Sequence, residues 1–203
     1  MSSMNIFLLR ILALIGLLFV MPLIVLSAIF ILIEDGFPVL FIQKRLGKNE
    51  KIFELYKIRT MYKNTPNLGT HEISKSQYLK TGSILRKLKI DELPQIFNFI
   101  RGDLNLVGPR PGLPVQEKLR KYRSINNIFK EFPGITGLAQ VLGYDMSNPE
   151  LLSKIDKLYI DNRSFKLDFL ILIATFIKAF RHRLYLKFET ALNEIESKEN
   201  TIC

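Results

Sequence analysis

Residues 85–111 read LRKLKIDELPQIFNFIRGDLNLVGPRP and combine acidic and basic side chains at short intervals. Asp91 and Glu92 are adjacent carboxylates behind a basic run, Asp103 is a third carboxylate, and Arg110 stands between two prolines. A carboxylate can attack phosphorus or hold a divalent cation, and guanidinium groups bind phosphate oxygens in pairs. This segment therefore indicates chemistry on a phosphate ester.

A purely structural interpretation of the same residues is available. Asp91 fits a helix N-cap, with Pro94 in the first turn, where the missing N–H costs little. Residues 108–111 fit a rigid turn. The two interpretations are compatible, because a helix N-terminus also favours an ionised carboxylate. The structural one does not explain why both features occur in one short segment with Asp103 between them.

Three motifs in this order resemble the bacterial sugar transferase family, the small monotopic polyprenyl-phosphate phosphoglycosyl transferases. They are IDELPQ at residues 90–95, GDLNLVGPRP at residues 102–111 and PGITGLAQ at residues 133–140. The resemblance extends from the apolar N-terminus to about Arg181. Three long motifs in the right order are more specific than any short pattern.

The resemblance implies an enzyme that transfers substituted phosphate groups. Its reaction would move a sugar-1-phosphate from a UDP-sugar to polyprenyl (undecaprenyl) phosphate. The products would be a polyprenyl-diphosphate-sugar and UMP, in the first membrane step of surface glycoconjugate assembly. Asp91 is the implied nucleophile, which forms a phosphosugar-aspartate, and Glu92 is the second catalytic residue. Both carboxylates are expected to hold Mg²⁺.

The resemblance also implies a set of supporting and phosphate-binding residues. The residues expected to bind substrate phosphate are Lys57, Arg59, Arg86 and Arg110. Asp103 is expected to orient an arginine or the metal, and Gln140 to support the site. The chain has neither a Gly-x-Gly-x-x-Gly nor a Walker motif, so side chains and Mg²⁺ would have to hold the nucleotide.

Two runs after the apolar segment, residues 39–45 and 51–61, predict a β-hairpin with a turn at residues 46–50. Lys57 and Arg59 alternate onto one side of the second strand. As an alternative, they are only a solvated basic strand end. The run Tyr56-Lys57-Ile58-Arg59-Thr60-Met61 resembles a motif of the family, which favours Arg59 as a phosphate contact.

Residues 11–33 are almost wholly apolar, and at about 1.5 Å per residue they can cross a hydrocarbon core of about 30 Å. Pro22 at the midpoint predicts a kink. A kinked helix could enter and leave on one face, and a straight span is the alternative. The resemblance implies the re-entrant form, at the cytoplasmic face of the bacterial inner membrane. Met21 replaces the family's usual serine, so the freed carbonyl would have to be accommodated by Ser27, by packing or by lipid adaptation.

Further helices are expected at residues 95–100, 116–122 and 151–160, and a rigid turn at residues 132–137. Residues 165–180 are strongly apolar and are followed by Arg181 and Arg183. This pattern predicts an interfacial amphipathic helix against anionic lipid, and a buried core helix is the alternative.

The predicted fold class is α+β and mainly helical. The expected parts are a re-entrant membrane helix at residues 1–36, a cytoplasmic catalytic domain at residues 37–188 and a frayed tail at residues 189–203. A length of 203 residues suits one domain.

A net charge of +10 indicates anionic partners, here a phospholipid membrane and phosphorylated substrates. The basic residues are spread along the chain without an aromatic-rich binding signature, so no nucleic acid is expected. A non-catalytic membrane scaffold of the same fold is the other alternative. It is favoured by Phe132 and Tyr144, which stand where the family commonly has arginine.

Overall fold

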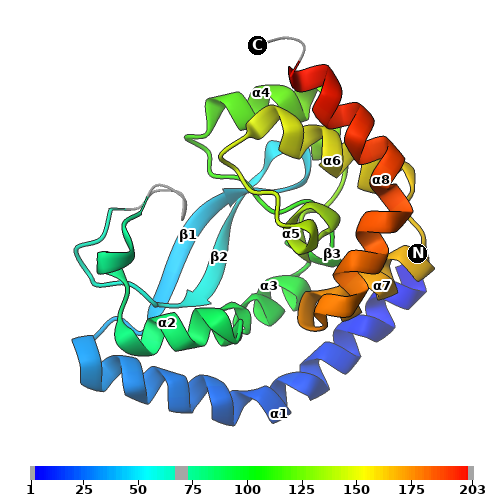
Figure 1. Ribbon diagram of the computed structural model, residues 1–203. Coiled ribbons are helices and arrows are strands. Elements are labelled where there is room, and N and C mark those ends of the chain that lie inside the picture. Colours follow the sequence, from blue (N-terminus) through cyan, green and yellow to red (C-terminus); the bar gives the residue numbers. More distant parts are fainter. Residues whose placement is uncertain (1–2, 67–72, 201–203) are drawn as a thin grey trace. The chain divides into compact units, whose positions relative to one another are not determined.

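In the part of the chain that the structure describes, the protein is mostly helical and carries two small sheets of two strands each. The computed structural model describes residues 3–66 and 73–200 (Figure 1). The predicted α+β class is confirmed. The chain divides into two compact units, one built from residues up to 44 and residues 53–103, the other from residues 45–52 and from residue 104 onward.

Helix α1 (Ser3–Asp35) is continuous through Pro22. Within the described residues, α1 is the one helix that is long and apolar enough to cross a membrane, over Leu8–Asp35. Figure 1 shows that α1 bends along its length. Ser27 Oγ donates to the Leu23 carbonyl at 2.7 Å, so it serves its own turn of the helix. Ser27 therefore does not replace the bond that Pro22 cannot donate to Leu18.

The predicted hairpin is confirmed as β1 (Leu40–Leu46) and β2 (Ile52–Ile58), with the short 3-10 helix η1 (Lys48–Glu50) between them. The first unit continues with η3 (Lys75–Gln77), α2 (Lys80–Lys87), η4 (Ile90–Glu92) and α3 (Gln95–Arg101). Helix α3 confirms the helix predicted at residues 95–100 and is capped by Gly102, whose φ of +92° suits glycine. The core of this unit is apolar and consists of Ile31, Ile58, Leu79 and Leu85.

The second unit contains a parallel pair of strands, β3 (Asn105–Val107) and β4 (Gly134–Thr136). Strand β4 lies inside the segment predicted as only a rigid turn, so that prediction was wrong for these residues. The pairing needs close backbones: a Cβ on Gly134 would lie 2.1 Å from the Gly108 nitrogen. Two of the sequence motifs thus meet through their glycines.

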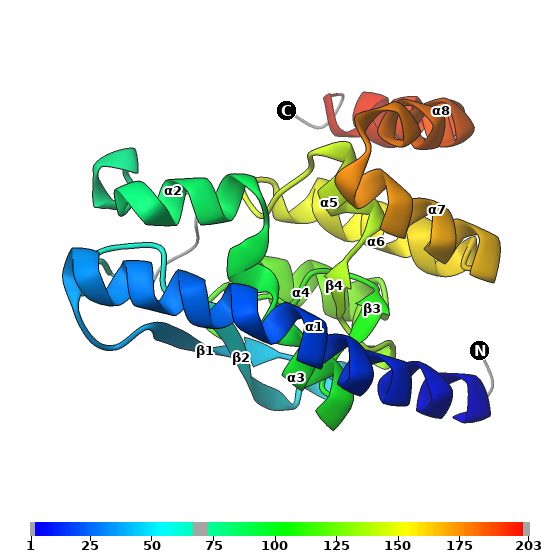
Figure 2. The ribbon, with the colours of Figure 1, turned by 90° about the horizontal axis from the view of Figure 1, so that it is seen from below.

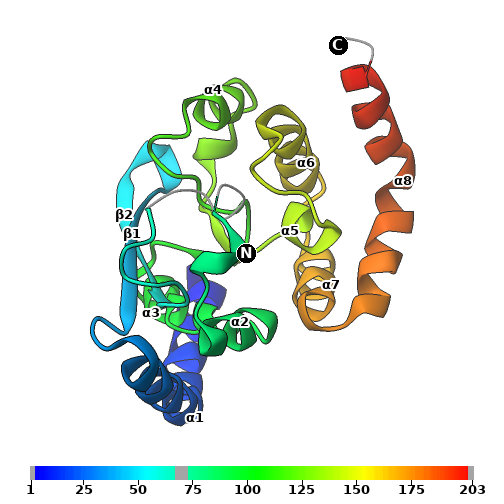
Figure 3. The same ribbon diagram turned by 60° about the vertical axis from the view of Figure 1, so that its left-hand side comes forward.

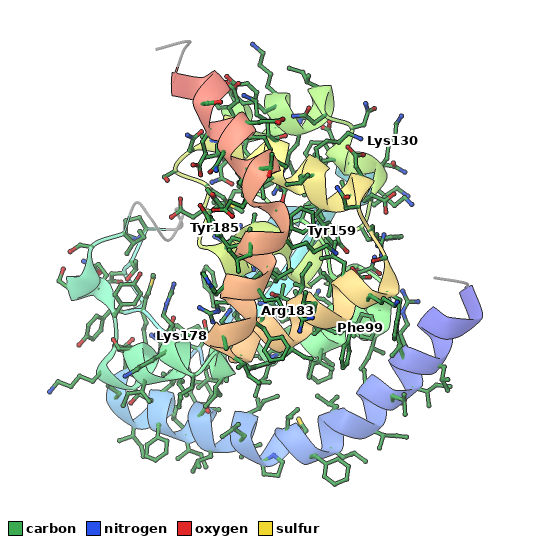
Figure 4. All side chains as sticks on the ribbon, turned by 45° about the vertical axis from the view of Figure 1, so that its right-hand side comes forward. Phe99, Lys130, Tyr159, Lys178, Arg183 and Tyr185 are labelled. Carbon is green, nitrogen blue, oxygen red and sulfur yellow. The ribbon has the colours of Figure 1, made fainter. Side chains whose placement is uncertain are left out.

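The rest of the second unit is mainly helical. The helices are α4 (Glu117–Ile125), η5 (Ile128–Lys130), α5 (Leu138–Leu142), α6 (Pro149–Asp161), α7 (Phe165–Phe176) and α8 (Lys178–Asn200). Helix α7 contacts both strands of this small sheet. Helices α4 and α6 confirm the predictions at residues 116–122 and 151–160. Tyr159 lies in the core of this unit and is labelled in Figure 4.

Helix α7 is buried on one face and exposed on the other. Leu167 and Ile171 lie in the core, while Phe165 and Phe169 are exposed by 71% and 56%. The core alternative is therefore correct for one face, and lipid contact by the other face stays a prediction. Lys178 and Arg183 follow at the start of α8 (Figure 4).

The predicted frayed tail was wrong for residues 189–200, because α8 continues to Asn200. Leu184, Phe188 and Leu192 recur on one helical face and are buried in the core of the second unit. Helix α8 packs on α5, α6 and α7, as Figures 2 and 3 show from two sides. Residues 201–203 lie outside the described part of the chain.

Candidate functional site

The two adjacent carboxylates lie in η4, a single 3-10 turn between α2 and α3. Lys89, which precedes this turn, has a φ of +58°. Such a left-handed conformation is uncommon for a residue other than glycine and is enriched at functional sites. Asp91 is buried, and α3 begins after Pro94. The N-cap interpretation of Asp91 is therefore wrong.

Lys57 and Glu92 form an ion pair. The Lys57 ammonium lies 3.0 Å from Glu92 Oε1, and the two side chains are exposed by only 14% and 17%. Lys57 belongs to β2, so the pair joins the hairpin to η4, which is called the carboxylate turn below. The structure brings these two predicted site residues together, and phosphate binding by Lys57 stays a prediction.

Arg86 lies in the last turn of α2, four residues before η4 begins at Ile90. Its Nη1 donates to Thr60 Oγ1 at 3.4 Å, and its Cζ lies 4.8 Å from the centre of the Tyr78 ring. Stacking on an aromatic face orients a guanidinium without using its N–H groups. Within the described residues only one of these groups is hydrogen-bonded, so Arg86 retains donors for a phosphate.

Arg59 is committed to protein acceptors. Its guanidinium pairs with the Asp35 carboxylate and donates to the carbonyls of Pro38 at 2.5 Å and Gly36 at 2.6 Å. The residue is only 5% exposed. This geometry does not supply the expected phosphate contact, because every guanidinium nitrogen already faces an oxygen of the protein.

Asp103 accepts a hydrogen bond from Asn98 Nδ2 at 3.0 Å and lies 3.6 Å from Arg101 Nε. Asn98 is fully buried, donates also to the Glu54 carbonyl at 2.6 Å and accepts from the Tyr56 N–H at 3.1 Å. The arginine beside Asp103 is Arg101, which was not among the predicted site residues, and the expected supporting role of Asp103 stays a prediction. Sequence reasoning missed Asn98 and Arg101, although an amide inside the apolar run 95–100 was a usable signal.

Arg110 belongs to the second unit, where its backbone is held in place. Its carbonyl accepts from Arg123 Nη1 at 2.7 Å, and the next carbonyl, of Pro111, accepts from Arg45 Nη1 at 2.9 Å. Arg123 is itself paired with Asp156 at 2.6 Å, and both side chains are 3% exposed. Burial raises the pKa of Asp156, and Arg123 opposes that shift.

Gln140 also lies in the second unit, in α5. Its Nε2 donates to the Ile135 carbonyl at 3.3 Å, and its Oε1 is buried with no hydrogen-bond partner among the described residues. A buried oxygen without a partner is unfavourable unless something else donates to it. The other predicted site residues lie in the first unit and are Lys57, Arg59, Arg86, Asp91, Glu92 and Asp103.

Asp91 and Glu92 are the residues that could hold the expected Mg²⁺. In residues 3–66 and 73–200, no group of three or more His, Cys, Asp or Glu side chains forms a metal cage. Mg²⁺ commonly needs only one or two carboxylates, with substrate phosphates and water completing its shell. The adjacent carboxylates fit that donor set.

Comparisons with known proteins identify similar sequences along most of the chain. The bacterial sugar transferase family matches residues 3–182. The uncharacterized sugar transferase EpsL of Bacillus subtilis is 42% identical over 148 residues, which are 70% of this chain and 70% of that protein. The exopolysaccharide production protein ExoY of Sinorhizobium fredii is 32% identical over 181 residues, or 77% of this chain and 79% of that protein.

A larger relative is similar over a smaller share of its own length. The UDP-N-acetylgalactosamine-undecaprenyl-phosphate N-acetylgalactosaminephosphotransferase of Aeromonas hydrophila is 36% identical over 163 residues. These residues are 76% of this chain but only 38% of the Aeromonas protein. This chain therefore corresponds to a minor part of that transferase.

Proposed function

Because the chain belongs to the bacterial sugar transferase family, we propose that it transfers a sugar-1-phosphate from a UDP-sugar to polyprenyl phosphate and releases UMP. The observation that carries the proposal is the carboxylate turn, with Asp91 and Glu92 between two helices and Lys57 paired to Glu92. The names of the relatives add support, since the Aeromonas protein is named a UDP-N-acetylgalactosamine-undecaprenyl-phosphate N-acetylgalactosaminephosphotransferase.

The proposed reaction has two displacements at the same phosphorus. A carboxylate oxygen of Asp91 attacks the phosphorus that carries the sugar, and the bond from this phosphorus to the UMP oxygen breaks. UMP leaves with the bonding electron pair, and the sugar phosphate stays on Asp91 as a mixed anhydride. A phosphate oxygen of the polyprenyl acceptor then attacks and displaces the aspartate. Covalent catalysis of this kind replaces one difficult step with two easier ones.

Other residues of the first unit would manage charge during both steps. Arg86, beside the carboxylate turn, has donors for a phosphate oxygen, while Lys57 keeps Glu92 oriented. The chemistry that Mg²⁺ supplies when held by Asp91 and Glu92 is neutralisation of phosphate charge. Arg110 and Gln140 stay predicted contributors from the second unit.

We place the reaction at the cytoplasmic face of the bacterial inner membrane, with α1 as a re-entrant helix. Near both of its ends, α1 contacts other elements of the first unit. The Arg10 guanidinium is so close to Gly102 that a Cβ there would lie 2.9 Å from Nη2, and Glu34 accepts from the Lys80 N–H at 2.6 Å. A helix whose two ends contact one compact unit is best explained by entry and exit on one face. The acceptor phosphate is then held beside a soluble donor, which reduces the entropic cost of their encounter.

Release of UMP tests the proposal. Parent protein and Asp91→Asn are incubated in detergent with undecaprenyl phosphate, Mg²⁺ and a panel of UDP-sugars. Asp161→Asn is the matched control, because Asp161 is an exposed surface carboxylate paired only to its helical neighbour Lys157 within the described residues. We expect UMP from the parent and from the control and none from Asp91→Asn. If the folded parent releases no UMP with any donor, the result would favour the alternative of a non-catalytic scaffold.

A further inference from the structure

The apolar helix α1 ends in two carboxylates, Glu34 and Asp35. Glu34 Oε1 accepts from the Lys80 N–H at 2.6 Å, and Oε2 accepts from the Thr81 N–H at 3.0 Å. These are the first N–H groups of α2, which have no partner within their own helix. The N-cap residue of α2 is Leu79, which has no side-chain acceptor. Glu34 therefore supplies from α1 the cap that α2 lacks, and its charge suits a helix N-terminus.

Asp35 makes the second connection, to the end of β2. Its carboxylate pairs with the buried guanidinium of Arg59, the residue that follows β2. Arg59 also donates to the carbonyls of Gly36 and Pro38, so it holds the chain that leaves α1. One guanidinium thus ties the end of the membrane helix to the hairpin.

These two connections involve the two elements that lead to or carry the candidate site residues. Helix α2 leads directly into η4, which carries Asp91 and Glu92, and β2 carries Lys57, the partner of Glu92. The segments beside these elements also contact each other, because the N–H of Leu79, just before α2, donates to the carbonyl of Thr60, just after β2, at 3.1 Å. Figures 1 and 2 show α2 beside the C-terminal half of α1.

We propose that Glu34 and Asp35 are positioning residues, which set the placement of Asp91, Glu92 and Lys57 from the membrane end of α1. This inference rests on the proposed transfer reaction. Neither carboxylate touches substrate; each acts through an element that bears a site residue. Loss of either contact misplaces the nucleophile relative to the donor phosphorus, and small misplacements reduce the chemical step strongly. Binding of the donor is affected much less.

The test compares Glu34→Ala and Asp35→Ala with the parent in UMP release. We expect kcat to fall about tenfold or more in each variant, while KM for the UDP-sugar changes less than about threefold. The conservative variants Glu34→Gln, which keeps one acceptor, and Asp35→Glu should recover part of the loss. Asp161→Asn is the control and should match the parent. The amount of folded protein in the membrane fraction is measured for each variant.

A double-variant cycle separates positioning from phosphate binding by Arg59. The double variant combines Asp35→Ala with Arg59→Ala. If Arg59 acts through Asp35, then Arg59→Ala and the double variant should each lose about as much kcat as Asp35→Ala alone. Additive losses, with a raised KM in Arg59→Ala, would show that Arg59 contacts substrate and would overturn its part in the inference.

Hydrogen exchange gives a readout besides activity. Backbone amides of residues 79–92 should exchange faster in Glu34→Ala than in the parent, because the cap on α2 is lost. An active parent whose Glu34 and Asp35 variants keep both kcat and slow exchange would overturn the inference and leave the proposed function intact. An inactive parent would overturn the proposed function, and the positioning role would fall with it.

Discussion

At the scale of single residues, the pair between Lys57 and Glu92 explains how a second carboxylate can lie beside the buried Asp91. Both side chains of the pair are more than four-fifths buried. An ionised carboxylate in such a place is costly unless a positive charge compensates it. Lys57 supplies that charge from β2.

Lys57→Met should therefore destabilise the protein. We expect a loss of about 1–3 kcal/mol in the free energy of unfolding, because a largely buried carboxylate loses the Lys57 ammonium that compensates its charge. Chemical unfolding in detergent measures it, and Lys57→Arg should stay close to the parent. Adding Glu92→Gln to Lys57→Met should restore part of the loss. Unchanged stability of Lys57→Met would contradict the pairing.

Replacement of Asn98 should also destabilise the protein. Asn98→Ala removes hydrogen bonds to Glu54, Tyr56 and Asp103 from a fully buried position. We expect a loss of about 2–4 kcal/mol, since the former partners lose their bonds and a cavity forms. Arg101→Ala, at a side chain that is 59% exposed, should cost less than about 1 kcal/mol. Equal effects of the two changes on thermal unfolding would argue against this network.

Sequence reasoning identified the reactive carboxylates more easily than their supports. The density of charge around Asp91 and Glu92 is local and visible in the sequence. The pairing of Arg59 with Asp35 joins positions 24 residues apart, and that of Asn98 with Glu54 joins positions 44 apart. Such pairs depend on tertiary packing, so Arg59 was expected at the substrate instead.

At the scale of elements, glycines decide how closely two motifs approach. Gly134→Ala would place a Cβ 2.1 Å from the Gly108 nitrogen. The nitrogen is a backbone atom and the Cβ is fixed directly to the backbone, so neither can rotate away. We expect a loss of about 2 kcal/mol or more, typical of overpacking, or failure to fold. Gly16→Ala in α1 is the control, because a Cβ there meets nothing within 4 Å. It should be neutral or stabilising by up to about 1 kcal/mol. A Gly134→Ala variant that unfolds at the parent's temperature would contradict the close approach.

Local patterns predicted the elements well where periodicity was strong. The hairpin and helices α3, α4 and α6 follow from alternation and helical spacing. Strand β4 was missed because three residues pair in parallel with a segment about thirty positions away, which no local pattern reveals. Helix α8 was not predicted, because residues 189–203 were interpreted as a frayed tail, although Leu184, Phe188 and Leu192 recur at helical spacing. Their spacing of four was a signal in the sequence.

At the scale of the whole molecule, the contacts at both ends of α1 predict its topology. With native Cys203 replaced by serine, single cysteines are introduced at Ser3 and at Phe37, one beyond each end of the apolar stretch. A membrane-impermeant thiol reagent should label both from the cytoplasmic side of oriented vesicles and neither from the other side. Labelling of the two positions from opposite sides would establish a spanning helix and contradict the re-entrant form.

The family and the general class of chemistry were predictable because three motifs occur in order along one chain. The match over residues 3–182 confirms the family. The part beyond it is most of α8, whose buried leucines complete the core of the second unit. Sequence resemblance could not anticipate the greater part of this helix, because the residues after 182 lie beyond the match.

The most direct test of the central claim is to capture the sugar phosphate on Asp91. The protein is incubated with Mg²⁺ and a UDP-sugar that supports UMP release, without the lipid acceptor, then quenched and digested with trypsin. Cleavage after Lys89 and Arg101 yields a peptide of residues 90–101, in which Asp91 and Glu92 are the carboxylate side chains. We predict that mass spectrometry finds the sugar phosphate on this peptide in the parent, lost on addition of undecaprenyl phosphate and absent from Asp91→Asn. An adduct that persists in Asp91→Asn, or UMP release with no adduct on this peptide, would contradict the account.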